Sequence, residues 1–137
     1  MNIYFACSIT GGRDFEGAYQ AIVAALIADG HAVPNAHLAE SGVPAREAEI
    51  PPQVVYARDV GWIRACEILI AEVSIPSHGV GYEIGFALGL GKRVLAVYRS
   101  DRKVSKMISG NPDTNLHLLE YRNLDEAVQK ILNFLRL

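Results

Sequence analysis

The segment from Ser77 to Gly85, with the sequence SHGVGYEIG, places a single carboxylate among glycines and apolar residues. It directly follows the apolar run 68–73, which is typical of a buried strand. An ionised carboxylate in such surroundings costs free energy to desolvate unless a ligand or a reaction offsets that cost. Glu83 is therefore the first candidate for a reactive group.

Two loops rich in glycine and hydroxyl side chains are candidates for binding an anion near that carboxylate. They are Ser8–Arg13 (SITGGR) and Ser74–Gly81 (SIPSHGVG), and each leads into a predicted helix. Free N–H groups and the helix dipole at such positions favour an anion, and the first loop adds an arginine. The glycines of the second loop are spaced GxGxxxG, which matches no standard phosphate fingerprint. The prediction of a phosphate site therefore depends on the position of both loops, since one alone is typical of ordinary α/β turns.

Strand-like and helical segments alternate along the chain. The predicted strands are 3–7, about 32–33, 68–73, 93–98 and 116–121, and the predicted helices are about 15–29, 54–66, 79–90 and 124–137. The segment 40–52 holds three prolines and a glycine, which favours a surface loop. We expect a single α/β domain over 1–137, with a three-layer Rossmann or flavodoxin-like fold, a five-stranded parallel sheet and helices on both faces. Ligands of such sheets bind beyond the carboxyl ends of the strands, where both loops lie.

Composition excludes several classes of function. Half of the 137 residues are apolar and the formal net charge is -2, so we expect no nucleic-acid partner. No apolar run approaches about 18 residues and no signal peptide is recognisable, which favours a cytoplasmic protein without membrane contact. The two cysteines, Cys7 and Cys66, lack CxxC spacing and fit reduced thiols. The four histidines lack metal-ligand spacing, so we expect neither metal nor cofactor.

Four segments carry a specific resemblance: YFACSITGGR (4–13), DVGW (59–62), AEVSIPSHGVGYEIG (71–85) and SKMI (105–108). In this order they resemble the 2'-deoxynucleoside 5'-phosphate N-hydrolases of the nucleoside 2-deoxyribosyltransferase superfamily. The segment PSHGVGYE is the most specific part. The resemblance implies cleavage of the N-glycosidic bond of deoxynucleoside monophosphates, which yields a free base and 2-deoxyribose 5-phosphate.

For three residues the resemblance implies catalytic roles. Glu83 would be the catalytic glutamate, Tyr4 its hydrogen-bonding partner, and Asp59 the acid near the base and sugar. The chemistry is consistent with this, because breaking a deoxyribosyl C–N bond builds positive charge on the anomeric carbon. A carboxylate there stabilises the charge or bonds to the carbon. A second group must protonate the departing base, and Asp59 is the candidate.

The resemblance also implies a substrate-binding set. Ser8, Gly12, Arg13 and Ser77 would hold the phosphate and sugar, while His37 would approach the base. Residues 105–107 would reach into the site of the other subunit of a homodimer. The complete predicted set is Cys7, Ser8, Ile9, Thr10, Gly11, Gly12, Arg13, His37, Ser77, Gly79, Gly81, Ser105, Lys106 and Met107. The chain departs from the family at position 7, usually a glycine, and at position 10, usually a basic residue.

Other interpretations of the same residues stay open. Glu83 could merely complement a helix dipole, Asp59 could be a solvated acid paired with Arg58 or Arg64, and Tyr4 could be an ordinary sheet residue. At the level of function, a deoxyribosyltransferase would pass the sugar to a second base, and a non-catalytic nucleotide sensor would bind without turnover. The serines and the arginine placed for a phosphate favour the hydrolase, because the transferases act on nucleosides.

Overall fold

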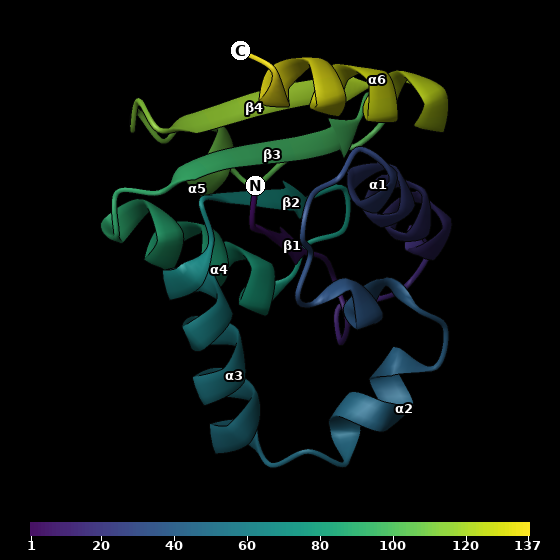
Figure 1. The fold of residues 1–137 in the computed structure, drawn as a ribbon, viewed down its shortest axis with the longest axis vertical. Coiled ribbons are helices and arrows are strands. Elements are labelled where there is room, and N and C mark those ends of the chain that lie inside the picture. The colour runs from purple at the N-terminus through teal and green to yellow at the C-terminus, as the bar shows by residue number, and fades with distance from the viewer.

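A four-stranded parallel sheet forms the middle layer of the computed structural model, which describes residues 1–137 (Figure 1). The strands lie side by side in chain order: β1 (Ile3–Ala6), β2 (Ile68–Glu72), β3 (Arg93–Arg99) and β4 (Leu116–Tyr121). The helices are α1 (Glu16–Ala28), η1 (a 3₁₀ helix, Ala36–Ala39), α2 (Val43–Ala48), α3 (Pro52–Ala65), α4 (His78–Gly89), α5 (Lys106–Ser109) and α6 (Leu124–Leu135). None of these helices combines the length and apolarity needed to cross a bilayer.

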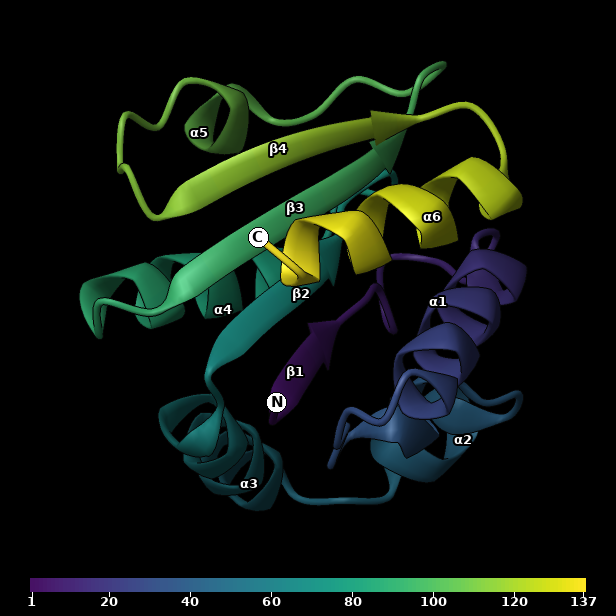
Figure 2. The same ribbon diagram turned by 45° about the horizontal axis from the view of Figure 1, so that its top comes forward.

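The sheet is buried on both faces, which explains the continuous apolar strands. Along β2, Ile68 and Ile70 pack with α1 and α6, whereas Leu69 and Ala71 pack with α3 and α4. These helix pairs cover opposite faces of the sheet, as Figure 2 shows. Because Ala6 of β1 pairs with Ala71 of β2, the loops that follow these strands emerge next to each other. The predicted α/β architecture with helices on both faces is confirmed.

The prediction of a fifth strand is wrong. Ala32 forms only an isolated parallel bridge with Asn2, on the outer edge of β1. Pro34 follows and has no N–H to continue the pairing. The side chain of Asn35 takes over instead: it accepts from the Phe5 N–H at 3.1 Å and donates to the Phe5 carbonyl at 2.6 Å. The side-chain amide of Asn35 thus takes the place of the missing strand beside Phe5. Because Ala32 lies on the side of β1 that faces away from β2, β1 is the edge strand of the sheet.

The predicted loop 40–52 in fact contains α2, and its prolines mark where helices begin. Pro44 lies in the first turn of α2 after Gly42, whose φ is +78°. Pro52 is the first residue of α3. Proline is tolerated at these positions because the first N–H groups of a helix have no intrahelical partner. Reading proline only as a breaker therefore missed a helix.

Candidate active site

A cavity of about 650 Å³ opens at the carboxyl ends of β1 and β2, between α2, α3 and α4. Two carboxylates that we predicted as catalytic, Glu83 from α4 and Asp59 from α3, both line it. The members of the predicted substrate-binding set that also line it are Cys7, Ile9, Thr10, Ser77 and Gly79. The fold therefore brings distant segments of the chain to one hollow.

At this cavity the carboxylate of Glu83 accepts a hydrogen bond from the hydroxyl of Tyr4. Tyr4 is 1% exposed, and its strand position points it toward α4. Burial raises the pKa of the Glu83 carboxyl to about 7; the hydroxyl of Tyr4 opposes that rise and the charge of Asp59 adds to it. Burial, together with the neighbouring carboxylates, also raises the pKa of Tyr4 far above its usual range, so the phenol stays a donor. Glu83 is thus a poorly solvated carboxylate oriented by one neutral donor.

Asp59 lies in a more polar part of the cavity wall. The Nε of Arg58 donates to its Oδ1 at 2.9 Å. Burial raises the pKa of the Asp59 carboxyl, and the hydrogen bond and charge of Arg58 oppose that rise. Two carboxylates with different partners therefore flank one cavity: Glu83 accepts from a neutral hydroxyl, and Asp59 accepts from a cationic guanidinium.

The first turn of α4 is the candidate anion site. Ser77 caps the helix by accepting from the Val80 N–H at 3.3 Å, and Gly79 leaves the backbone open to the cavity. The loop after β1 approaches this turn closely, since a Cβ on Gly11 would lie 2.6 Å from the Pro76 carbonyl oxygen. N–H groups at a helix N-terminus bind phosphate without any basic side chain.

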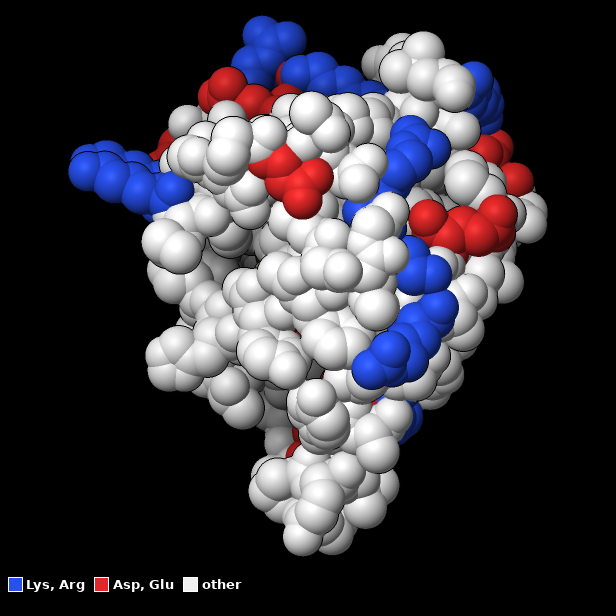
Figure 3. Space-filling model, turned by 90° about the vertical axis from the view of Figure 1, so that its left-hand side faces the viewer, with Lys and Arg blue, Asp and Glu red and all other residues white.

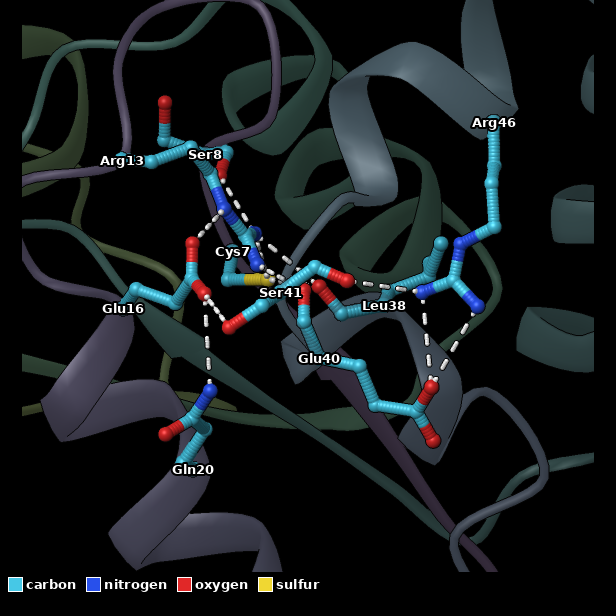
Figure 4. A network of polar contacts seen from close by, with 9 residues as sticks. All are labelled: Cys7, Ser8, Arg13, Glu16, Gln20, Leu38, Glu40, Ser41 and Arg46. Atoms are coloured by element: carbon cyan, nitrogen blue, oxygen red, sulfur yellow. Dashed lines mark hydrogen bonds and ion pairs between the residues drawn. The ribbon is translucent and has the colours of Figure 1, made fainter.

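Arg13, which we predicted as a phosphate ligand, does not line the cavity. Figure 4 shows its guanidinium turned toward backbone carbonyls. It donates to the carbonyls of Ser8 at 3.1 Å, Leu38 at 3.0 Å and Glu40 at 2.8 Å, and to the Glu16 carboxylate at 3.1 Å. In this conformation Arg13 fastens the loop after β1 to η1, and its contact with phosphate stays a prediction.

Several other predicted ligands lie beside the cavity rather than on its wall. The ring of His37 packs edge-on against Trp62, with the ring centroids 5.8 Å apart. Ser8 is fully buried, and its Oγ has no hydrogen-bond partner. Gly12, with φ of +127°, lies in the loop before α1, and Gly81 lines a second, neighbouring cavity.

Residues 105–107 lie at a neighbouring hollow, which Ser105 and Met107 line. Ser105 caps α5 by accepting from the Met107 N–H at 3.2 Å. Ser105 and Met107 line a second cavity of about 640 Å³, which shares Ser77 with the first one. Met107 is 84% exposed, and Lys106 is exposed as well. None of the three reaches the cavity that contains Glu83 of the same chain.

Sequence reasoning missed the aromatic part of the wall. Tyr56 of α3 and Tyr82 of α4 line the cavity, with their hydroxyls 3.4 Å apart and each side chain more than half exposed. Tyr56, Val60 and Ile63 recur at helical spacing beside Asp59, a pattern that could have indicated one cavity-facing stripe of α3. Glu47 of the unpredicted α2 also lines the cavity.

Comparison with known proteins places the chain in a family. The sequence model described as nucleoside 2-deoxyribosyltransferase matches residues 3–126. The chain belongs to that family. Among relatives in the nucleoside 2-deoxyribosyltransferase family, a mouse protein named 5-hydroxymethyl-dUMP N-hydrolase is 40% identical, over 96% of this chain and 78% of its own length. A Methanosarcina mazei protein with the provisional name 2'-deoxynucleoside 5'-phosphate N-hydrolase 1 is 38% identical, over 98% of this chain and 84% of its own length.

A solved structure with the same architecture is that of a CMP N-glycosidase from Clostridium botulinum. It superimposes with a TM-score of 0.75 over 96% of this chain and 98% of its own, at 22% sequence identity. At that identity the likeness concerns the fold. The predicted resemblance to the nucleoside 2-deoxyribosyltransferase superfamily is confirmed, whereas the roles of individual residues remain predictions.

Proposed function

We propose that this protein hydrolyses the N-glycosidic bond of 2'-deoxynucleoside 5'-monophosphates, releasing a free base and 2-deoxyribose 5-phosphate. The observation that carries the proposal is the Glu83 carboxylate, held by the Tyr4 hydroxyl in a cavity that begins at the N-terminus of α4. A phosphate on that N-terminus places the attached sugar near the carboxylate. The names of the mouse and archaeal relatives support the same class of reaction and substrate.

In the proposed reaction the C–N bond breaks and its electron pair leaves with the base. Asp59 donates a proton to the base, and the Glu83 carboxylate stabilises the positive charge on the anomeric carbon or bonds to it. A water molecule then forms the new C–O bond at the anomeric carbon, and one of its protons returns to Asp59. Where Glu83 has bonded to that carbon, the same attack breaks this bond and restores the carboxylate. Tyr4 keeps Glu83 oriented throughout. Apolar groups and the rings of Tyr56 and Tyr82 offer surface for a planar base.

The decisive experiment is incubation with a panel of deoxynucleoside monophosphates, followed by chromatography for free base and 2-deoxyribose 5-phosphate. Matched deoxynucleosides serve as controls. Charge-assisted bonds to phosphate contribute about 1.5 to 3 kcal/mol each, so we expect kcat/KM for nucleosides to be lower by roughly a hundredfold or more. Equal rates on both substrates, accelerated by an added base, would instead assign a transferase. Binding without any free base would assign a nucleotide sensor.

We further propose that the protein works as a homodimer in which residues 105–107 complete the site of the partner. Two observations support this: the Met107 side chain is 84% exposed, and it lines a hollow that opens beside Ser77. Figure 3 shows a broad area without charged side chains on the side of α3 and α4. Exposed apolar residues on these helices include Val54, Tyr56 and Tyr82. Such an area suits a two-fold contact between identical surfaces.

Subunit mixing tests the shared site. Glu83→Gln is combined with the double variant Ser105→Ala, Met107→Ala, each of which we expect to be inactive alone. A heterodimer would contain one intact site, so activity should recover to about a quarter of wild type when half of the dimers are mixed. If verified subunit exchange restores no activity, residues 105–107 serve their own chain.

A further inference from the structure

Arg58 joins two carboxylates in the wall of the cavity, although it was not among the predicted site residues. Its Nε donates to Asp59 Oδ1 at 2.9 Å, and its Nη1 and Nη2 donate to the two oxygens of Glu47 at 3.1 and 2.5 Å. Its guanidinium also lies over the ring of Trp62, 5.2 Å from the centroid. The three charged side chains are only 12 to 20% exposed, so solvent screens these pairs less than it screens surface ion pairs.

The Glu47 end of this network belongs to α2. In both ribbon views the ribbon of α2 lies away from the sheet and apart from that of α3 (Figures 1 and 2). It nevertheless contributes Pro44, Glu47 and Ala48 to the cavity wall. The pair Glu47–Arg58 is the only ion pair that joins α2 to another helix. The same guanidinium therefore fixes the outer wall of the cavity and the carboxylate of Asp59.

Each element packed around Asp59 contributes an ionisable group that faces its carboxyl group. The ionisable groups that face it are Arg58 on its own helix, Glu47 on α2, His37 on η1, Glu83 on α4 and Tyr4 on β1. Burial raises the pKa of Asp59, Arg58 opposes that rise, and Glu47 adds to it. Arg58 and Glu47 thus shift the pKa of Asp59 in opposite directions, although they form an ion pair with each other.

We propose that Arg58 and Glu47 form a positioning pair that aims Asp59 into the cavity and sets how readily its carboxyl group releases a proton. The inference rests on the proposed function, in which Asp59 protonates the departing base. Arg58 does not line the cavity, so it acts through Asp59. The negative charge of Glu47 partly offsets the positive charge of Arg58 at Asp59 and thereby favours the protonated form of the Asp59 carboxyl group.

The proposal is testable because removing Arg58 and removing Glu47 should shift the titration of Asp59 in opposite directions. In Glu47→Gln the full charge of Arg58 acts on Asp59, so the carboxylate is favoured and titrates at lower pH. In Arg58→Gln that charge is lost, so Asp59 titrates at higher pH. A purely structural role predicts one common direction, because either substitution removes the contact between α2 and α3. Arg46→Gln is the matched control, since it removes an exposed pair with Glu40 from α2 and leaves Asp59 untouched.

The experiment follows the Asp59 carboxyl by carbon-13 NMR in ligand-free protein and the alkaline limb of kcat against pH. We expect shifts of about half a pH unit or more, downward for Glu47→Gln and upward for Arg58→Gln, in both measurements. Arg58→Lys keeps a charge without the planar fork and should shift less than Arg58→Gln. Thermal unfolding and hydrogen exchange over 43–51 identify any variant that is misfolded, and Arg58→Lys replaces Arg58→Gln if that variant does not fold.

Two results would overturn the proposal. The first is that Glu47→Gln and Arg58→Gln shift the Asp59 titration in the same direction. The second is that the Asp59 titration shifts while the alkaline limb of kcat against pH stays unchanged. The proposed function fails separately, if wild type releases no base from any monophosphate. In that case the NMR titration still decides whether the pair controls Asp59.

Discussion

Glu72 and Glu83 are both glutamates paired with a tyrosine hydroxyl, but they lie on opposite faces of the sheet. Glu72, at the end of β2, is fully buried and accepts from the Ser74 N–H at 2.6 Å, from the Ser74 hydroxyl at 3.0 Å and from Tyr121. Glu83 accepts from Tyr4 alone and faces the cavity. Burial raises the pKa of both carboxyl groups. The number of donors, rather than burial, separates a carboxylate that fastens a loop from one available to a substrate.

The largest expected effect is on catalysis at Glu83. Glu83→Gln keeps the shape but cannot share negative charge with the anomeric carbon, so turnover should fall at least roughly a thousandfold, or about 4 kcal/mol of barrier. Binding of the monophosphate, measured by calorimetry, should persist. Glu72→Gln is the control and should retain kcat per folded molecule. Near wild-type turnover by Glu83→Gln would remove Glu83 from the reaction.

The second effect is on stability at Glu72. Glu72→Gln places an amide NH₂ where three donors converge, so we expect the free energy of unfolding to fall by about 1 to 3 kcal/mol. Denaturant unfolding measures this. Glu83→Gln should cause no comparable loss of the free energy of unfolding, because the open side of Glu83 has no protein donor. A stability loss that is larger at Glu83 would invert the comparison.

The tyrosines sharpen the same contrast at smaller scale. Tyr4→Phe removes the donor that orients Glu83, and we expect kcat to fall about tenfold, equivalent to about 1.4 kcal/mol. Tyr121→Phe removes a donor to Glu72, and we expect about 1 kcal/mol of lost stability with unchanged kcat. Paired kinetic and unfolding measurements on both variants give the result. Equal kinetic losses would mean that the two pairs act alike.

The smallest effect is a pH dependence. The acid limb of kcat/KM should lie near pH 7, where the Glu83 carboxyl ionises, and Tyr4→Phe should move it to higher pH because the lost hydroxyl favoured the carboxylate. Stability has the opposite trend: native Glu83 holds its proton up to about pH 7 and the unfolded chain releases it near 4.5, so stability falls between these values. Glu83→Gln should lack that part of the decline. An acid limb near pH 4 would indicate a well-solvated Glu83.

The sequence predicted those parts of the fold that depend on local pattern. The predicted strand over 68–73 and the predicted helix over about 15–29 correspond to β2 and α1, whose burial on the sheet follows directly from side-chain type. The fifth strand failed because the edge of β1 is closed by the side chain of Asn35, which no backbone pattern records. The prediction of a loop over 40–52 missed helix α2 because Pro44 lies in the first turn of that helix, where proline is tolerated.

The site was predictable where topology alone assembles it. Thr10 and Ser77 follow adjacent parallel strands, and Glu83 was conspicuous among glycines, so their meeting at one cavity could be expected. The direction of Arg13 could not, because its long side chain binds carbonyls whose positions depend on η1. The network of Arg58 likewise depends on α2, which the sequence did not reveal.

The amide of Asn35 has a consequence for how this protein behaves at high concentration. An open strand edge is a template on which another chain can add a strand, and β1 would present such an edge beyond the bridge between Asn2 and Ala32. By occupying both the N–H and the carbonyl of Phe5, Asn35 leaves no ladder for an incoming strand to extend. One short side chain thus guards the molecule against edge-to-edge aggregation.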